Sequence, residues 1–234
     1  MAMATVTTPQ PANETPGSDP RVVRRGVGWE GYSSALEARG DKKYPRMVYL
    51  DGDLYLMSPA YRHENSAIRL GIFVMEVVVG LDIPCIPARA TTFRDRPKKG
   101  GAEGDETFYL TNVPRIRGRR DDDLKLPEDP PPDLVVEAVN THDADEAIEV
   151  WRRFGVPEIW VQEKDRLLIL VLQAGGQYEP SDSSAAFPFL KASEIQEWVN
   201  KPQGDSETSW IKELRQWVAG TLVERRRLEA ERGA

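Results

Sequence analysis

The spacing of apolar residues in the first half of the chain predicts short strands around one long helix. Apolar runs at 47–49 and 54–57 flank Asp51-Gly52, a dipeptide that is typical of a β-hairpin turn. From 62 to 80 the apolar residues recur at helical spacing. Residues 83–93 favour an extended segment, because prolines and β-branched residues interrupt any helical pattern, and 94–104 indicates a polar, Gly-rich loop.

The second half continues the alternation of strands and helices. Residues 107–110 predict a short strand, and 134–139 form an almost unbroken apolar run, as in a strand that is covered on both faces. A helix is expected from Asp143 until Gly155 ends it, followed by strands at 158–162 and 167–172 and a last helix from about Trp210. This order predicts an α/β (α+β) fold: a mixed β-sheet flanked by helices.

The same pattern suggests one domain with two tails. Residues 1–20 are rich in Thr, Pro and Ala and predict a disordered tail. Residues 21–219 hold the expected domain, and 220–234 predict a charged helical tail. The charged, proline-rich segment 115–132 indicates a surface excursion.

Composition narrows the class of protein. Hydrophobic residues make up 40 % of the chain, which is ordinary for a globular domain, and no stretch approaches the ~20 apolar residues of a membrane span. Cys85, the single cysteine, cannot form an internal disulfide, so we expect a reducing, cytoplasmic location. The net charge of −7 argues against a protein that coats DNA, but not against an enzyme that contacts nucleic acid locally.

Two acidic positions are candidates for chemistry. Glu137 interrupts the apolar run 134–139, and a buried carboxylate is costly unless it is paired or binds a cation. Asp105 lies where the Gly-rich loop enters the next strand. If the two strands are neighbours, both carboxylates converge at a sheet edge, and two hard oxygen donors suit Mg²⁺ or Mn²⁺. The alternatives are that Asp105 is a turn residue and that Glu137 pairs with an arginine.

Other chemistries have less support in the sequence. The two histidines, His63 and His142, show no metal-ligand spacing with each other or with Cys85. No nucleophile elbow, phosphate-binding loop or dinucleotide fingerprint is present. The arginines at 115–120 are followed by three aspartates, so a solvated charged surface is their simplest interpretation.

Five ordered segments resemble the signature blocks of a known family. They are Tyr49-Leu50-Asp51-Gly52-Asp53-Leu54 with Leu56-Met57-Ser58-Pro59 and His63-Glu64; Glu103-Gly104-Asp105-Glu106-Thr107-Phe108-Tyr109; Pro132-Asp133-Leu134-Val135-Val136-Glu137; Gly155-Val156-Pro157-Glu158-Ile159-Trp160; and Ala186-Phe187-Pro188-Phe189-Leu190. Over roughly residues 45–218 the chain resembles the Uma-type restriction endonucleases, a branch of the PD-(D/E)XK nuclease superfamily.

This resemblance implies a restriction-endonuclease-like fold and a metal-dependent reaction. It puts Asp105 and Glu137 on the family's metal-binding acids, which hold Mg²⁺ (or Mn²⁺) to activate water for attack on a DNA phosphodiester. It also makes His63 and Glu64 further candidates near the site. DNA is the implied partner, and a homodimer is expected by analogy.

The chain departs from the family's pattern at the lysine that normally assists the metal. Val139 occupies the usual lysine position, and Ala147 stands at the place in the following helix to which this branch has moved it. Gly104 also replaces the usual proline. The loops offer four other cations: Arg94, Lys98, Lys99 and Lys125. An endonuclease is the leading hypothesis, a catalytically impaired binding protein the alternative, and an interaction scaffold built on 115–132 a weaker third.

Overall fold

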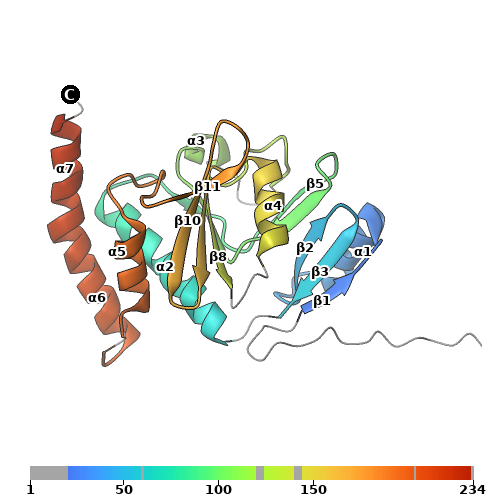
Figure 1. Ribbon diagram of the computed structural model, residues 1–234, viewed down its shortest axis with the longest axis horizontal. Coiled ribbons are helices and arrows are strands. Elements are labelled where there is room, and N and C mark those ends of the chain that lie inside the picture. The colour runs from blue at the N-terminus through green and yellow to red at the C-terminus, as the bar shows by residue number, and fades with distance from the viewer. Residues whose placement is uncertain (1–20, 59–60, 120–123, 140–143, 203, 233–234) are drawn as a thin grey trace, which may run out of the picture.

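In the computed structural model, two β-sheets lie side by side with helices around them (Figure 1). The structure describes residues 21–58, 61–119, 124–139, 144–202 and 204–232, without the side chains at 61–63, 229–230 and 232. Along this part of the chain the strands are β1 Arg21–Arg24, β2 Arg46–Leu50, β3 Asp53–Met57, β4 Ile86–Pro87, β5 Thr92–Asp95, β6 Gly100–Glu103, β7 Glu106–Tyr109, β8 Leu134–Val139, β9 Glu158–Glu163, β10 Arg166–Leu172 and β11 Tyr178–Ser181.

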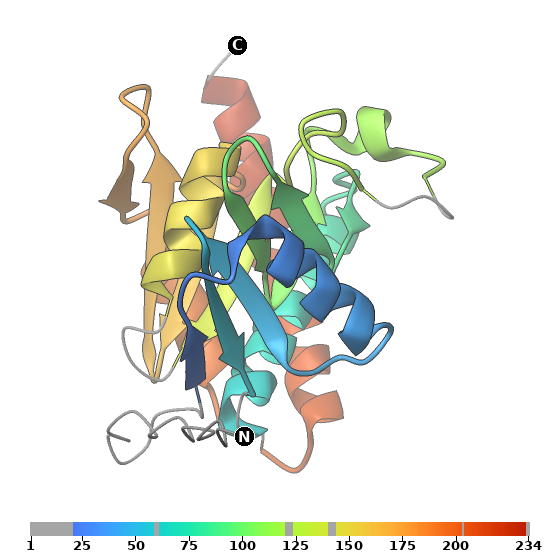
Figure 2. The same ribbon diagram turned by 90° about the vertical axis from the view of Figure 1, so that its right-hand side faces the viewer.

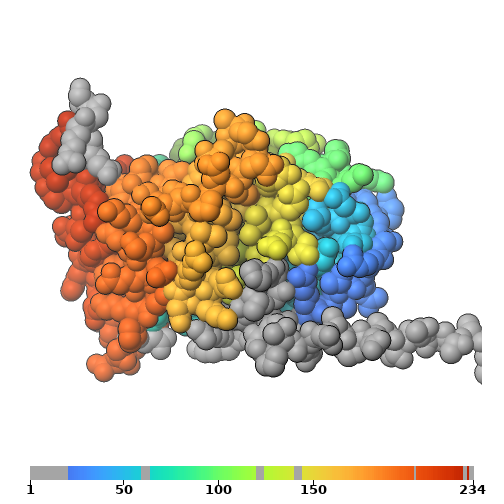
Figure 3. All heavy atoms as spheres, in the orientation of Figure 1, coloured from blue at the N-terminus to red at the C-terminus, as the bar shows by residue number. Residues whose placement is uncertain are grey.

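The helices bracket these strands. They are α1 Gly28–Arg39, α2 Tyr61–Gly80, α3 Val113–Ile116, α4 Asp145–Phe154, α5 Ala192–Asn200, α6 Glu207–Trp217 and α7 Val223–Arg232, with a π-helical turn at Val218–Leu222. The space-filling view shows α7 projecting at one end of the molecule (Figure 3). Within the described residues, no helix has both the length and the apolar character needed to cross a membrane.

The N-terminal sheet is antiparallel throughout, in the order β1-β3-β2-β6-β5. Its β2–β3 hairpin turns at Asp51 and Gly52, with φ values of 50° and 103°, so the predicted hairpin is confirmed. Both turn residues need a positive φ, which Asp and Gly tolerate. This sheet and α1 face the viewer when the molecule is turned by 90° (Figure 2).

The central sheet is mixed, in the order β11-β10-β9-β8-β7-β4, with β8 and β9 parallel. Along β8 the side chains alternate between two cores, because successive residues of a strand point to opposite faces. Leu134 and Val136 pack with α2, α5 and α6, whereas Val135 packs with α4 and the N-terminal sheet. The expected α/β architecture is confirmed, and β8 is covered on both faces as its apolar run predicted.

One predicted segment is wrong. Residues 94–104 are not a loop, because β5 and β6 form a second hairpin there. Gly101 in β6 is required by a close approach: a Cβ at this position would lie 2.3 Å from the hydroxyl oxygen of Tyr32. Tyr32 is fully buried and stacks on Tyr49 with ring centroids 4.9 Å apart, so its ring has no room to move.

We predict that Gly101→Ala lowers the free energy of unfolding by about 1–3 kcal/mol, because the added methyl group overpacks against Tyr32. Gly175→Ala is the control, since a Cβ there meets no heavy atom within 4 Å. Urea denaturation of the two variants checks this. Equal midpoints would show that the Tyr32 ring moves freely and would contradict the packing described.

Candidate active site

Strand register brings Asp105 and Glu137 together. Glu106 of β7 is paired with Val136 of β8, and Asp105 is the residue just before β7. The backbone N–H of Asp105 donates to the carbonyl of Val136 at 3.0 Å and its Oδ2 accepts from the N–H of Ala138, so Asp105 lies beside the segment of β8 that carries Glu137. The side chain of Glu137 lies on the face toward α4, where it accepts from Trp151.

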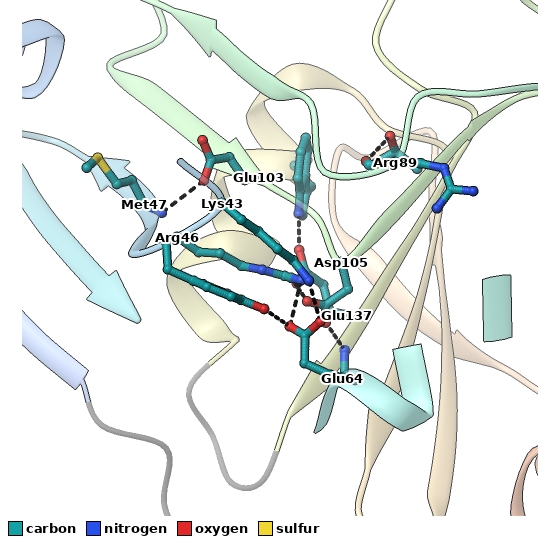
Figure 4. Close-up of polar contacts among 12 residues, drawn as sticks. Lys43, Arg46, Met47, Glu64, Arg89, Glu103, Asp105 and Glu137 are labelled. Carbon is teal, nitrogen blue, oxygen red and sulfur yellow. Dashed lines mark hydrogen bonds and ion pairs between the residues drawn. The ribbon is translucent and has the colours of Figure 1, made fainter. Parts of the chain in front are cut away.

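The fold itself orients each carboxylate. Asp105 and Glu137 are 5 % and 7 % exposed. Oδ2 of Asp105 accepts a 2.6 Å hydrogen bond from the backbone N–H of Ala138, and Oε1 of Glu137 accepts one of 2.6 Å from the indole N–H of Trp151 on α4. Figure 4 shows the two carboxylates pointing toward each other. The strands on which the two acids were expected to converge are thus neighbours, and the role of the acids as metal ligands stays a prediction.

Arg46 supplies the cation at this cluster. It begins β2 in the N-terminal sheet, and its side chain is 7 % exposed. One terminal nitrogen forms an ion pair with Oδ1 of Asp105, and the other lies 3.1 Å from Oε1 of Glu64 on α2 (Figure 4). Arg46 thus joins the N-terminal sheet to the acids of the central sheet.

Glu64 is held by a second set of donors. Lys43 donates to its Oε2 at 2.6 Å, and the Tyr44 hydroxyl donates to its Oε1 at 2.5 Å. Partial burial acts to raise the pKa of Glu64, but the hydrogen bonds from Lys43 and Tyr44 and the charge of Arg46 outweigh it and lower the pKa. Glu64 is therefore an ionised neighbour of the acid pair at neutral pH.

Burial dominates at Glu137. It raises the pKa of this carboxyl from 4.5 to about 7, against the hydrogen bond from Trp151 and the charge of Arg46, which lower it. A buried carboxylate with this tendency toward its neutral form is stabilised in its charged form by an added cation.

Glu103 and Glu106, the acids on either side of Asp105 in the sequence, have other partners. Glu103 forms a bidentate pair with Arg39, both contacts being 2.6 Å, and accepts from the backbone N–H of Met47 at 3.2 Å. Glu106 points to the opposite face, beside Gly71 of α2. Burial raises the pKa of Glu106, with the charge of Arg89 opposing it.

The two histidines and Ala147 contribute no described side chain to this acid cluster. His63 lies in the first turn of α2, one residue before Glu64, but its side chain lies outside the described residues, as does His142 entirely. Ala147 is 4 % exposed and packs with Trp151 in the core under α4.

The contacts described for the four loop cations offered in place of the lysine are made with other parts of the chain. The backbone carbonyls of Lys98 and Lys99 accept from Arg153 and from the backbone of Asp51, at the far end of β2. Arg94 acts electrostatically on Tyr32 of α1, and the backbone N–H of Lys125 donates to Asp129. Arg46 was not among the predicted residues. Its only sequence signal is its place at the start of the apolar run that forms β2.

The donor chemistry fits a small divalent cation held by two carboxylates. Mg²⁺ typically binds protein through one or two carboxylates and keeps waters and substrate oxygens as its other ligands. In the part of the chain that the structure describes, no three His, Cys, Asp or Glu side chains are grouped to hold a metal. Asp105 and Glu137 are a pair of carboxylates of this kind, and Asp105 is shared with the Arg46 guanidinium.

Comparison with known proteins identifies the family. The family model described as "Uma2: Putative restriction endonuclease" matches residues 29–200. The chain therefore belongs to the Uma2 family.

A solved structure is similar in outline. It is a putative nuclease belonging to DUF820 from Anabaena variabilis, with a TM-score of 0.48 and 14 % sequence identity, and the match covers 66 % of this chain and 92 % of that chain. No curated protein matches the chain.

We predict that Glu137→Gln stabilises the metal-free protein at neutral pH. The folded-state pKa of about 7 lies above the ordinary value of 4.5. The neutral Glu137 carboxyl therefore makes its full contribution to the free energy of unfolding below pH 4.5. This contribution is lost as the pH rises through 7. The variant keeps an acceptor for Trp151 and has no charge to bury.

Thermal unfolding in EDTA between pH 4 and pH 8 measures this difference. The free energy of unfolding of the variant should exceed that of the wild type increasingly as the pH rises, by up to roughly 3 kcal/mol. Parallel stability profiles for the two proteins would show that Glu137 ionises at its usual pH.

Proposed function

We propose that this protein is a Mg²⁺- or Mn²⁺-dependent endonuclease that hydrolyses DNA phosphodiester bonds. The main support is that Asp105 is hydrogen-bonded to Val136 and Ala138, the two neighbours of Glu137 in β8, and that both acids are buried. Membership of the Uma2 family, whose printed description is a putative restriction endonuclease, agrees with this chemistry.

Asp105 and Glu137 would hold the divalent cation. When bound, such an ion lowers the pKa of a water molecule and polarises a phosphoryl oxygen. Ala138 and Trp151 act as positioning residues, because each fixes one oxygen of an acid and thereby orients the other. Preorganised carboxylates of this kind need no rearrangement at the moment of reaction.

The surrounding charges suit a local contact with a polyanion. Lys43 is 55 % exposed at its side chain and lies at the opening of the cluster, held by Glu64. Arg89, 77 % exposed, pairs instead with Glu106 on the opposite face of the central sheet. Lys43 would meet a DNA phosphate although the whole chain carries a net charge of −7. His63 remains a proposed site residue because it precedes Glu64 on α2.

A second candidate function is a binding protein that retains the fold without hydrolysis. Two observations favour it: Arg46 is paired with Asp105, and Ala147 is buried in the core where the resemblance puts a lysine. Such a protein would bind DNA and cleave none of it, in Mg²⁺ or in Mn²⁺.

We predict that Asp105→Asn and Glu137→Gln each slow cleavage of supercoiled plasmid by about 100-fold or more, since either change removes a charged metal ligand. The rate of nicking in Mg²⁺ and in Mn²⁺ measures this. Wild-type protein that binds the plasmid but leaves it intact in both metals would support the binding protein instead.

Glu158→Gln is the matched control. Glu158 is also fully buried and also accepts a hydrogen bond from a tryptophan indole, that of Trp160. It pairs with Leu134 at the opposite end of β8, away from the acid pair. Its cleavage rate per folded molecule should match that of the wild type, so a loss there would mean that general damage to the fold explains all three variants.

A further inference from the structure

Arg46 makes an unusual set of contacts for a buried arginine. Arg39 and Arg69 each form a bidentate pair with one carboxylate, Glu103 and Glu207 respectively, as is typical of structural ion pairs. Arg46 instead divides its two terminal nitrogens between Asp105 and Glu64. Its Nε is buried and has no hydrogen-bond partner among the described residues, which is also true of the Nε of Arg39.

This arrangement leaves Arg46 with unused capacity as a donor. A guanidinium carries five N–H groups in a planar fork that matches the oxygens of a phosphate group. A buried donor without a partner costs free energy, which a ligand oxygen at that place would recover. The same guanidinium forms an ion pair with Oδ1 of Asp105, one of the two acids proposed to hold the divalent cation.

The formal charges of the cluster, with all three carboxyls ionised, point to two ligands of opposite sign. In that state Glu64, Asp105 and Glu137 contribute three negative charges, and Lys43 and Arg46 contribute two positive ones, so the sum is −1. A divalent cation would change this sum to +1, and one phosphodiester would then bring it to zero. Neither ligand alone balances the cluster.

We propose that Arg46 has two positions: it neutralises Asp105 when the acid pair holds no divalent cation, and it contacts the DNA phosphodiester when the pair does. This rests on the proposed function for the metal-holding role of Asp105. Arg46 competes with the cation for Asp105 in the first state, and it supplies positive charge beside the reacting phosphate in the second. Metal and DNA binding are coupled through this one side chain.

Two binding experiments on the full chain test the proposal without relying on cleavage. In the first, isothermal titration with Mn²⁺ in the absence of DNA compares the wild type with Arg46→Met. Removing the competing charge should tighten Mn²⁺ binding by about tenfold or more. Unchanged or weaker Mn²⁺ binding by the variant would overturn the competition between Arg46 and the ion.

In the second, fluorescence anisotropy measures the affinity for a labelled DNA duplex in Ca²⁺ and in EDTA. Arg46→Met should bind the duplex about tenfold more weakly than the wild type in Ca²⁺, yet equally well in EDTA, where Arg46 is engaged with Asp105. If the variant lost the same DNA affinity in Ca²⁺ and in EDTA, or lost none in either condition, Arg46 would not change partners.

Controls separate this proposal from damage to the fold and from failure of the nuclease hypothesis. Arg69→Met removes an arginine that is buried to the same degree and should alter neither affinity. Arg46→Lys keeps the charge without the fork, so it should fold where Arg46→Met does not, and its Mn²⁺ affinity should lie between those of wild type and Arg46→Met. A wild type that cleaves no DNA would refute hydrolysis, while both titrations would still decide the role of Arg46.

Discussion

The pairing of β7 with β8 is the constraint on which the candidate site depends. A shift of one residue in this register would turn Asp105 to the face of α2 and separate it from Glu137. The register is fixed by burial on both faces, because Val135 and Val136 pack into different cores and cannot exchange places. The packing that stabilises the central sheet therefore also sets the geometry of its two acids.

Placing two carboxylates in this position opposes the stability of the metal-free chain. Burial favours the neutral form of Glu137, and the Trp151 indole N–H and the charge of Arg46 oppose it. Asp105 is held by the backbone N–H of Ala138 and by the Arg46 guanidinium. Removing one partner of a buried charge is costly, so Arg46 also secures the N-terminal sheet against the central one. Arg46 also occupies a carboxylate oxygen that a metal ion would need, so the proposal links its release to metal binding.

Local signals in the sequence predicted much of the fold and part of the site. A few neighbouring residues are enough to predict the Asp51-Gly52 turn and the strand β8. Glu137 was conspicuous because it interrupts the apolar run of that strand. The β5–β6 hairpin was missed, since Gly101 in a polar stretch indicates a loop until Tyr32 is known to pack on it. Arg46 was missed because it lies in the N-terminal sheet and contacts an acid of the central sheet, and a local sequence pattern does not indicate contacts between residues so far apart in the chain.

A crystal soaked in Mn²⁺, with anomalous diffraction collected at the manganese edge, tests the central claim most directly. The account predicts an anomalous peak about 2.0–2.6 Å from carboxylate oxygens of both Asp105 and Glu137, with the Arg46 guanidinium no longer on Asp105. The absence of a peak at these two acids, with Arg46 still paired to Asp105 at saturating Mn²⁺, would contradict it.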